Sequence, residues 1–297
     1  MNSAFAHKFK IAVGTLCLLA TAGTATAQID PDKMTALKVC ADPFMLPFSN
    51  TKEQGFENKI AELFARKLGV SVQYEFFPQR MGFIRNTLRA EAESGPGYKC
   101  DLVINVPEAF ELAATTEPYY TTSYVLIYAK GRGMDSATSP EMLGELSEKQ
   151  GVNIKFGLVD RGPAQFWVAQ HGLMGNIVPY QGQTGDARLN LGKKLIGDVL
   201  SGKIDATIAW GPSAGYFTGR GDAKGKLVVL PLRDDPESPY LKFEYSMAMG
   251  VRYGEKAWKD KVNELIRTNQ DEIDAILTDY GVPLLPIKKS ARKDDDD

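Results

Sequence analysis

The sequence comprises 297 residues with a net charge of −2, of which 43% are hydrophobic and 24% are charged. These proportions are typical of a globular protein, and the evenly mixed charges lack the basic surface that nucleic-acid-binding proteins present. Nucleic acid is therefore excluded as the expected partner. The first 27 residues stand apart, because Lys8 and Lys10 precede an apolar run at 11–20 and an Ala-x-Ala sequence at 25–27.

This N-terminal pattern predicts a cleavable secretory signal peptide over 1–27. Its apolar run is about half the ~20 residues that a membrane helix needs, so no membrane span is expected. Loss of 1–27 changes the net charge from −2 to −4. We therefore expect a mature protein that begins near Gln28 and resides in the periplasm.

Strands and helices are predicted to alternate through the first part of the mature chain. Strands are expected at 37–40, 70–77 and 101–105, and helices at 55–68 and 81–90. Gly69 is placed to end the first of these helices. This order predicts a parallel sheet with right-handed crossovers.

A further strand at 123–129 is followed by a glycine-containing break at 130–133, after which the pattern restarts. The next strands are expected at 154–159, 177–180, 204–210 and 227–230, with helices at 163–171 and 191–200. An extended segment at 243–251 and two helices, 256–268 and 271–280, complete the chain.

The order of elements predicts an α/β fold of two lobes joined by two hinge crossings, with a central cleft. Lobe one comprises 28–129 plus 243–297, and lobe two comprises 130–242. Ligands of open α/β sheets bind outside the carboxyl ends of the strands, and small-molecule sites favour clefts between domains. The predicted fold therefore points to a binding protein.

Two cysteines, Cys40 and Cys100, remain after Cys17 leaves with the signal peptide. An even number of cysteines in an oxidising compartment favours a disulfide. However, Cys40 ends one predicted strand and Cys100 begins another, which would offset the two along a parallel sheet. A disulfide needs Cα atoms within about 7 Å, so a bridge and two buried thiols both stay open.

Catalytic and metal-binding patterns are sparse. His171 is the one histidine after the signal peptide, and its place at a predicted helix C-terminus is ordinary for a polar cap. One histidine and two separated cysteines do not make a zinc site, and the sequence has neither a P-loop nor a dinucleotide-binding fingerprint. We therefore expect no enzyme activity, no metal and no resident cofactor.

The sequence TTEPYY at 115–120 looks like the T-x-P-Y signature of type II periplasmic binding proteins, where it closes lobe one near the hinge. Pro118 is expected to fix a turn, while Tyr119 and Tyr120 offer amphipathic surface at the cleft edge. The resemblance implies the type II periplasmic binding protein fold.

Amino-acid binders of that superfamily clamp the ligand with an arginine after the third strand and an aspartate at the end of a lobe-two strand. Here 105–112 contains no arginine, and Trp210 stands where the aspartate would be. A zwitterionic ligand would then lack its charge-assisted partners, which disfavours an amino acid. Arg80, Arg85 and Arg161 are the alternative cations, and an ordinary surface charge is the other interpretation of each.

A longer set of motifs occurs in order along almost the whole mature chain. These are VCADP (39–43), LPFSN (46–50), GFENKIA (55–61), PQRMGFIRNTL (78–88), KCD (99–101), TEPYY (116–120) and YGVPL (280–284). Together they resemble the MxaJ/XoxJ family of periplasmic proteins associated with quinoprotein methanol dehydrogenase.

The resemblance implies a binding-protein fold repurposed as an accessory of a PQQ-dependent methanol dehydrogenase, which it helps to mature or activate. The partner would be of the XoxF or MxaF type, with its cytochrome c as a further candidate partner. The lanthanide-type XoxJ branch is favoured over the calcium-type branch. PQQ and metal would belong to the partner enzyme, which agrees with the expectation of no cofactor in this chain.

Candidate cleft residues for a ligand or partner lie at predicted strand ends and loops. They are Asp42, Phe44, Phe48, Arg80, Arg85, Asn105, Tyr119, Tyr120, Asp160, Arg161, Trp210, Tyr216 and Phe217. Aromatic side chains anchor both protein interfaces and apolar pockets. We predict that more than half of the aromatic candidates line the cleft; the alternative is ordinary packing within the lobes.

Two other functions remain open at this stage. One is a substrate-binding receptor of an ABC-type transporter for a small molecule, acting with a membrane permease. The other is a lyase, because cyclohexadienyl dehydratases use the same fold. A lyase needs acidic or basic groups around an arginine-clamped carboxylate, and the arginine-free stretch after Asn105 argues against it.

Overall fold

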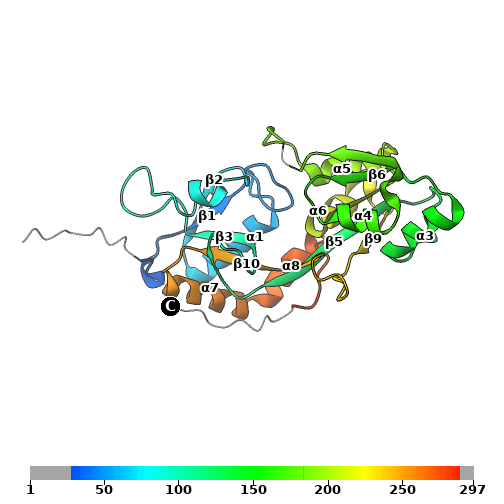
Figure 1. The fold of residues 1–297 in the computed structure, drawn as a ribbon. Helices are drawn as coiled ribbons and strands as arrows, with labels where there is room; N and C mark the ends of the chain where they lie inside the picture. The colour runs from blue at the N-terminus through cyan, green and yellow to red at the C-terminus, as the bar shows by residue number, and fades with distance from the viewer. Residues whose placement is uncertain (1–27, 183, 288–297) are drawn as a thin grey trace, which may run out of the picture.

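The computed structural model describes residues 28–182 and 184–287 (Figure 1). The predicted signal peptide, 1–27, and the charged C-terminal end, 288–297, lie outside the described residues. None of the helices in the described ranges combines the length and apolar character needed to cross a membrane.

The described strands form one mixed sheet with the order β2-β1-β3-β10-β5-β8-β6-β7, in which β4 also pairs with β10 and β9 with β5. Their bounds are β1 Ala36–Ala41, β2 Ser71–Phe76, β3 Leu102–Pro107, β4 Ala114–Thr115, β5 Tyr120–Ala129, β6 Phe156–Val159, β7 Ile177–Tyr180, β8 Ala206–Trp210, β9 Leu227–Pro231 and β10 Glu244–Val251.

The α-helices of the described chain are α1 Phe56–Leu68, α2 Phe83–Asn86, α3 Pro140–Gln150, α4 Ala164–Gln170, α5 Leu191–Ser201, α6 Gly211–Thr218, α7 Lys256–Thr268 and α8 Gln270–Asp279. Short 3₁₀ turns lie at η1 Pro31–Lys33, η2 Leu173–Asn176 and η3 Gly221–Ala223.

The elements gather into two lobes, one at each end of the long sheet (Figure 1). In the first lobe, β2, β1 and β3 are parallel, β10 is antiparallel to β3, and α1, α7 and α8 supply helices to its main core. In the second lobe, β7, β6 and β8 are parallel. One core of the second lobe contains residues of α3 and α4, and another contains residues of α5 and α6.

Strand β5 belongs to both lobes. Its first residues, 120–123, pair with β10, whereas 124–129 pair with β8 and β9. The link 232–243 returns beside it, because the Tyr124 N–H donates to the Phe243 carbonyl and the Leu232 N–H donates to the Tyr124 carbonyl. The division into 28–129 plus 243–297 and 130–242 stays a proposal, and the pairing favours a first boundary inside β5.

Most predicted elements appear close to their expected bounds. Helix α1 is an example: it spans Phe56–Leu68 and ends at Gly69, whose φ of 71° is the left-handed conformation. The Gly69 N–H donates to the carbonyls of Ala65 and Arg66, which closes the last turn.

The helix predicted over 81–90 is wrong in extent, because α2 holds a single turn, Phe83–Asn86. The Thr87 hydroxyl donates to the Phe83 carbonyl at 2.7 Å, which is a local alternative to the helical backbone bond. The Leu88 carbonyl accepts instead from the buried Arg252 guanidinium at 3.0 Å. Side chains therefore satisfy backbone groups that a longer helix would have used.

Helices α3 and α6 were not predicted. Helix α3 carries recognisable signals, since Ser139 precedes Pro140 at its start and Gly151 ends it in the left-handed conformation. Helix α6 begins with Gly211 and Pro212 and contains Gly215, residue types that are typical of turns.

Cys40 and Cys100 are joined by a disulfide, with Cα atoms 5.4 Å apart. The expected offset is present in the register, where Cys40 lies opposite Val103, but Cys100 precedes β3, which begins at Leu102, and its segment still reaches Cys40. The Asp101 N–H donates to the Lys38 carbonyl, which brings this segment against β1.

Candidate functional site

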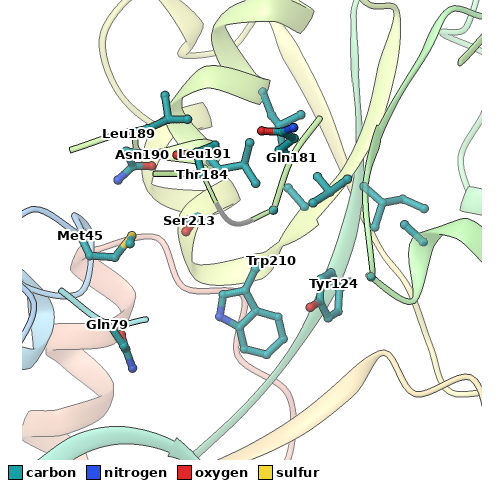
Figure 2. A pocket seen from close by; sticks show the side chains of 18 of the residues that line it. Met45, Gln79, Tyr124, Gln181, Thr184, Leu189, Asn190, Leu191, Trp210 and Ser213 are labelled. Atoms are coloured by element: carbon teal, nitrogen blue, oxygen red, sulfur yellow. The ribbon is translucent and has the colours of Figure 1, made fainter. Parts of the chain in front are cut away.

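A pocket of about 340 Å³ lies where the two lobes meet (Figure 2). The first lobe contributes Met45, Gln79 and Arg80 from loops that follow β1 and β2. The second lobe and the crossing strand contribute Tyr124, Val159, Gly162, Pro163, Ala164, Gln181, Gly182, Thr184, Leu189, Asn190, Leu191, Gly192, Leu195, Ile208, Ala209, Trp210 and Ser213.

Two aromatic rings lie side by side in the pocket wall (Figure 2). Tyr124 of β5 and Trp210 of β8 are register partners, so their side chains fall on the same face of the sheet. Their ring centroids are 5.1 Å apart, and Tyr245 of β10 packs against both. Burial raises the pKa of Tyr124, so this wall stays uncharged at neutral pH.

Asp42 holds the first-lobe side of the pocket in place without lining it. Its carboxylate accepts the Phe44 N–H at 2.7 Å and the Gln79 N–H at 2.5 Å, which ties the loop after β1 to the loop after β2. Its backbone exchanges two 2.9 Å bonds with the Ser49 hydroxyl. Asp42 is therefore a positioning residue for the loops that carry Met45 and Arg80.

A second acid, Glu57, lies buried behind Asp42 and is 6% exposed. Burial, and next the negative charge of Asp42, raise the pKa of Glu57 to about 8, against the lowering effect of a Ser49 hydrogen bond. Its Oε1 has no hydrogen-bond partner. Glu57 is therefore largely protonated at neutral pH, which avoids two negative charges in one buried site.

The second-lobe wall depends on the segment between β7 and α5. Asp160 Oδ1 accepts the Gly182 N–H at 2.5 Å, which fixes the start of this segment beside the end of β6. Asn190 caps α5 by accepting the Lys193 N–H at 3.0 Å, and the cap sets Leu191 at the pocket.

Of the predicted cleft residues, Arg80 and Trp210 line the pocket. Phe48, Tyr119 and Tyr120 are instead buried in the first-lobe core. The Tyr119 hydroxyl donates to the Ile104 carbonyl at 2.8 Å, and the Tyr120 hydroxyl donates to Asn105 Oδ1 at 2.8 Å. Because both hydroxyls find partners inside the lobe, these rings pack in the core and not at the cleft.

The remaining aromatic candidates also lie outside the pocket lining. Tyr216 and Phe217 belong to α6, where Tyr216 stacks on Tyr280 and Phe217 packs at a second-lobe core. Phe44 is 39% exposed and lies under the Arg188 guanidinium. Of the seven aromatic candidates, Trp210 therefore lines this pocket, whereas Phe44 and Tyr216 contact the other lobe outside it.

Among the remaining polar candidates, two hold pocket segments in place and three have no part in the pocket. Asp42 and Asp160 position pocket segments through backbone N–H groups, as described above. Arg85 and Arg161 are exposed and do not line the pocket. Asn105 is buried beside Tyr120 and serves the first-lobe core.

Several lining residues were missed from the sequence. Asn190 directly precedes the predicted helix 191–200, and a cap at the start of a helix was a usable signal. Met45 and Gln79 are neighbours of selected residues, but nothing in their spacing marks them. Tyr124 becomes a pocket residue through its register with Trp210, which a single sequence does not reveal.

The chemistry of the pocket is mainly apolar. Among its described lining residues none is acidic, and Arg80 is its cation. The polar groups are otherwise neutral, such as the side chains of Gln79, Gln181 and Ser213. An ammonium group entering this pocket would find no carboxylate, so the geometry disfavours a zwitterion.

His171 has a local role at the end of α4. Its ring stacks on Trp167 at 4.0 Å, and its Nδ1 lies 2.8 Å from the Trp167 carbonyl oxygen. Within residues 28–182 and 184–287, no group of three or more His, Cys, Asp or Glu side chains could hold a metal ion.

The two-lobed α/β fold and its interlobe pocket define a protein of the type II periplasmic solute-binding fold. An ancestral cationic amino-acid solute-binding protein has this fold, with a TM-score of 0.60, 17% identity, and coverage of 84% of this chain and 97% of that one. The periplasmic binding protein XoxJ from Methylobacterium extorquens AM1 is 31% identical, with a TM-score of 0.65, over 84% of this chain and 100% of that one. The chain therefore belongs to the MxaJ/XoxJ family.

A curated relative supports the same family. Protein MoxJ of Paracoccus denitrificans is 23% identical over 91% of this chain and 97% of its own length. No protein-family model matches the sequence.

Proposed function

We propose that this chain is a periplasmic accessory protein that binds a PQQ-dependent methanol dehydrogenase and helps to mature or activate it. One observation carries the proposal within the family: the interlobe pocket presents Trp210 and apolar side chains where amino-acid carriers of this fold place charged groups. Such a surface suits an apolar part of a protein partner better than a charged nutrient.

The proposal assigns the chemistry to the partner. The dehydrogenase supplies PQQ, its metal and the oxidation of the alcohol, while this chain supplies binding surface and no catalytic group. The XoxF-type, lanthanide-dependent enzyme is the favoured partner over the MxaF type. The cytochrome c of the same system is a further candidate.

Binding of the purified dehydrogenase to the mature chain tests the proposal directly. We expect the wild-type protein to bind the immobilised enzyme and to raise its metal or PQQ content. The variant Trp210→Ala removes the indole from the pocket wall and is expected to weaken binding by roughly tenfold or more. Tyr240→Ala is the matched control, because Tyr240 is 72% exposed and does not line the pocket.

A pull-down from the periplasm of methanol-grown cells distinguishes the accessory protein from a transport receptor. Recovery of a permease complex and no dehydrogenase would support the transporter receptor and overturn the accessory function. Equal binding of the dehydrogenase by wild type and Trp210→Ala would show that the pocket is not the contact surface.

A further inference from the structure

Two arginines on different elements donate across the boundary between the lobes. Arg80, in the first lobe, donates to the carbonyls of Thr184 and Asp186 in the second. Arg220, which follows α6 of the second lobe, donates to the Asp279 carbonyl at 2.6 Å and to the Tyr280 carbonyl at 3.4 Å. Each guanidinium therefore ties its own lobe to backbone of the other.

The Arg80 contact is one of three at the pocket. The Asn190 side-chain amide donates to the Leu46 carbonyl at 2.6 Å. The Arg188 guanidinium lies 5.7 Å from the centre of the Phe44 ring. All three contacts join the segment that follows β7 to the loops after β1 and β2.

The Arg220 contact has aromatic support. Its guanidinium lies 4.2 Å from the Tyr216 ring centre and 5.7 Å from that of Tyr280. The two tyrosine rings, one from each lobe, stack at 5.8 Å with 17° between their planes. A cation at the carbonyl end of α8 is also favoured by the helix dipole.

The backbones of the two lobes approach closely at the same place. A side chain on Gly215 of α6 would overlap the Gly281 carbonyl oxygen, and one on Gly211 would overlap the Ser123 carbonyl oxygen. The Thr122 hydroxyl of β5 donates to the Pro283 carbonyl at 2.8 Å. The segment that follows α8 is thus wedged between β5 and α6.

We propose that Arg80 and Arg220 form a two-sided lock, which holds the lobes in one relative position before any ligand or partner binds. The Arg80 contacts lock the pocket rim, and the Arg220 contacts lock the hinge.

The lock gives the pocket a fixed shape in the free protein. In a receptor whose ligand draws two separate lobes together, the free energy of closure reduces the observed affinity. A locked cleft needs no closure, and it presents the same surface with or without a small molecule. This inference does not depend on which protein binds the cleft.

Distance measurements between spin labels on the two lobes test the lock. Arg66→Cys on α1 and Gly197→Cys on α5 place the labels at exposed positions of the mature chain, and the native cysteines are already joined. The label pair on the otherwise wild-type protein is expected to give one narrow distance distribution without ligand. Arg80→Ala is expected to broaden it and to add a second, shifted population.

Arg85→Ala is the matched control, because Arg85 is exposed and lies outside the pocket lining. It is expected to keep the narrow distribution. Arg220→Ala tests the hinge side, and Arg220→Lys tests it in a variant that keeps the charge but loses the two-pronged donor. Both are expected to broaden the distribution.

A broad distribution in the ligand-free wild type overturns the proposal. So does a narrow distribution that neither Arg80→Ala nor the Arg220 variants change. Broadening from one arginine alone overturns the two-sided lock, because the other contact would then be incidental.

Discussion

Arg252 organises a buried charge cluster beneath the disulfide. It is 7% exposed and pairs with Asp101 and Glu255, each at 2.8 Å. It also donates to the Cys100 carbonyl, and its guanidinium lies 4.0 Å from the Tyr98 ring centre. Both carboxylates are buried, and the guanidinium opposes the burial that raises the pKa of Glu255.

Arg252→Ala is therefore expected to lower the free energy of unfolding by about 3–5 kcal/mol, since it removes the guanidinium that pairs with two buried acids. Arg267→Ala is the matched control, because its pair with Glu117 is about half exposed on both sides and contributes at most ~1 kcal/mol. Urea denaturation of the two variants measures the difference. Similar losses in both would contradict the assigned role of Arg252.

The raised pKa of Glu57 is expected to make the free energy of unfolding depend on pH. Its pKa is raised from 4.5 to about 8 in the folded protein by burial and then by Asp42. At a pH below both pKa values, Glu57 is protonated in the folded and in the unfolded protein, so its contribution to the free energy of unfolding is fully present. As pH rises from 4.5 toward 8, the unfolded state releases the proton first, so the free energy of unfolding falls, and the loss levels off above the folded pKa.

Glu57→Gln removes this titration and is expected to stabilise the protein by roughly 1–3 kcal/mol near pH 8, with less gain near pH 5. Denaturant titrations across that range measure the change. Glu62→Gln on the same helix controls for the loss of an acid from α1. A Glu57→Gln gain that is equal at both ends of the range would show that titration is not its cause.

At the scale of elements, glycine determines how closely α6 approaches the segment that follows α8. Gly215 and Gly281 bring backbone against backbone, whereas Gly197 on α5 faces open space. Gly215→Ala is therefore expected to destabilise the protein by about 1–3 kcal/mol, because α6 must move away. Gly197→Ala is expected to stabilise it by up to ~1 kcal/mol through helix propensity. Thermal melts measure the difference, because the melting temperature is expected to fall in Gly215→Ala and to rise in Gly197→Ala.

Glycines in α6 also explain why this helix was not predicted. Helix α7, Lys256–Thr268, and strand β7, Ile177–Tyr180, have the bounds predicted from their sequences, because each segment carries its own apolar pattern. In α6, Gly211 and Gly215 serve close packing with residues that are distant in sequence. Glycine is typical of turns, so the local sequence does not indicate a helix at 211–218.

The pocket was harder to predict than the elements that build it. Trp210 was found because it ends a strand that the pattern identified. Asn190 and the Leu46 carbonyl meet across 144 positions of sequence, and no local signal reports that contact. Tyr119 and Tyr120 were selected for the cleft but lie in the first-lobe core, because β5 starts at Tyr120, earlier than predicted, and Tyr119 directly precedes it.

At the scale of the whole molecule, the pocket chemistry predicts which ligands fail to bind. Zwitterionic amino acids are expected to leave the melting temperature unchanged at concentrations of about 1–10 mM, because the described lining offers their ammonium group no carboxylate. A ligand that did bind would be detected, since at 100 times its Kd it would stabilise the protein by ~2.7 kcal/mol. A thermal-shift series with lysine, arginine and glutamine measures this. A saturable rise with any one of them would favour the transport receptor over the accessory.

The position of β10 has a consequence for how the molecule assembles. It lies between β3 and β5 in the first lobe, yet it is made of residues 244–251, after every strand of the second lobe. A nascent chain that emerges from its N-terminus therefore completes the second lobe while β3 and β5 still lack their shared neighbour. Exposed strand edges invite pairing with other chains. A chaperone that shields such edges would have its target there until Val251 appears.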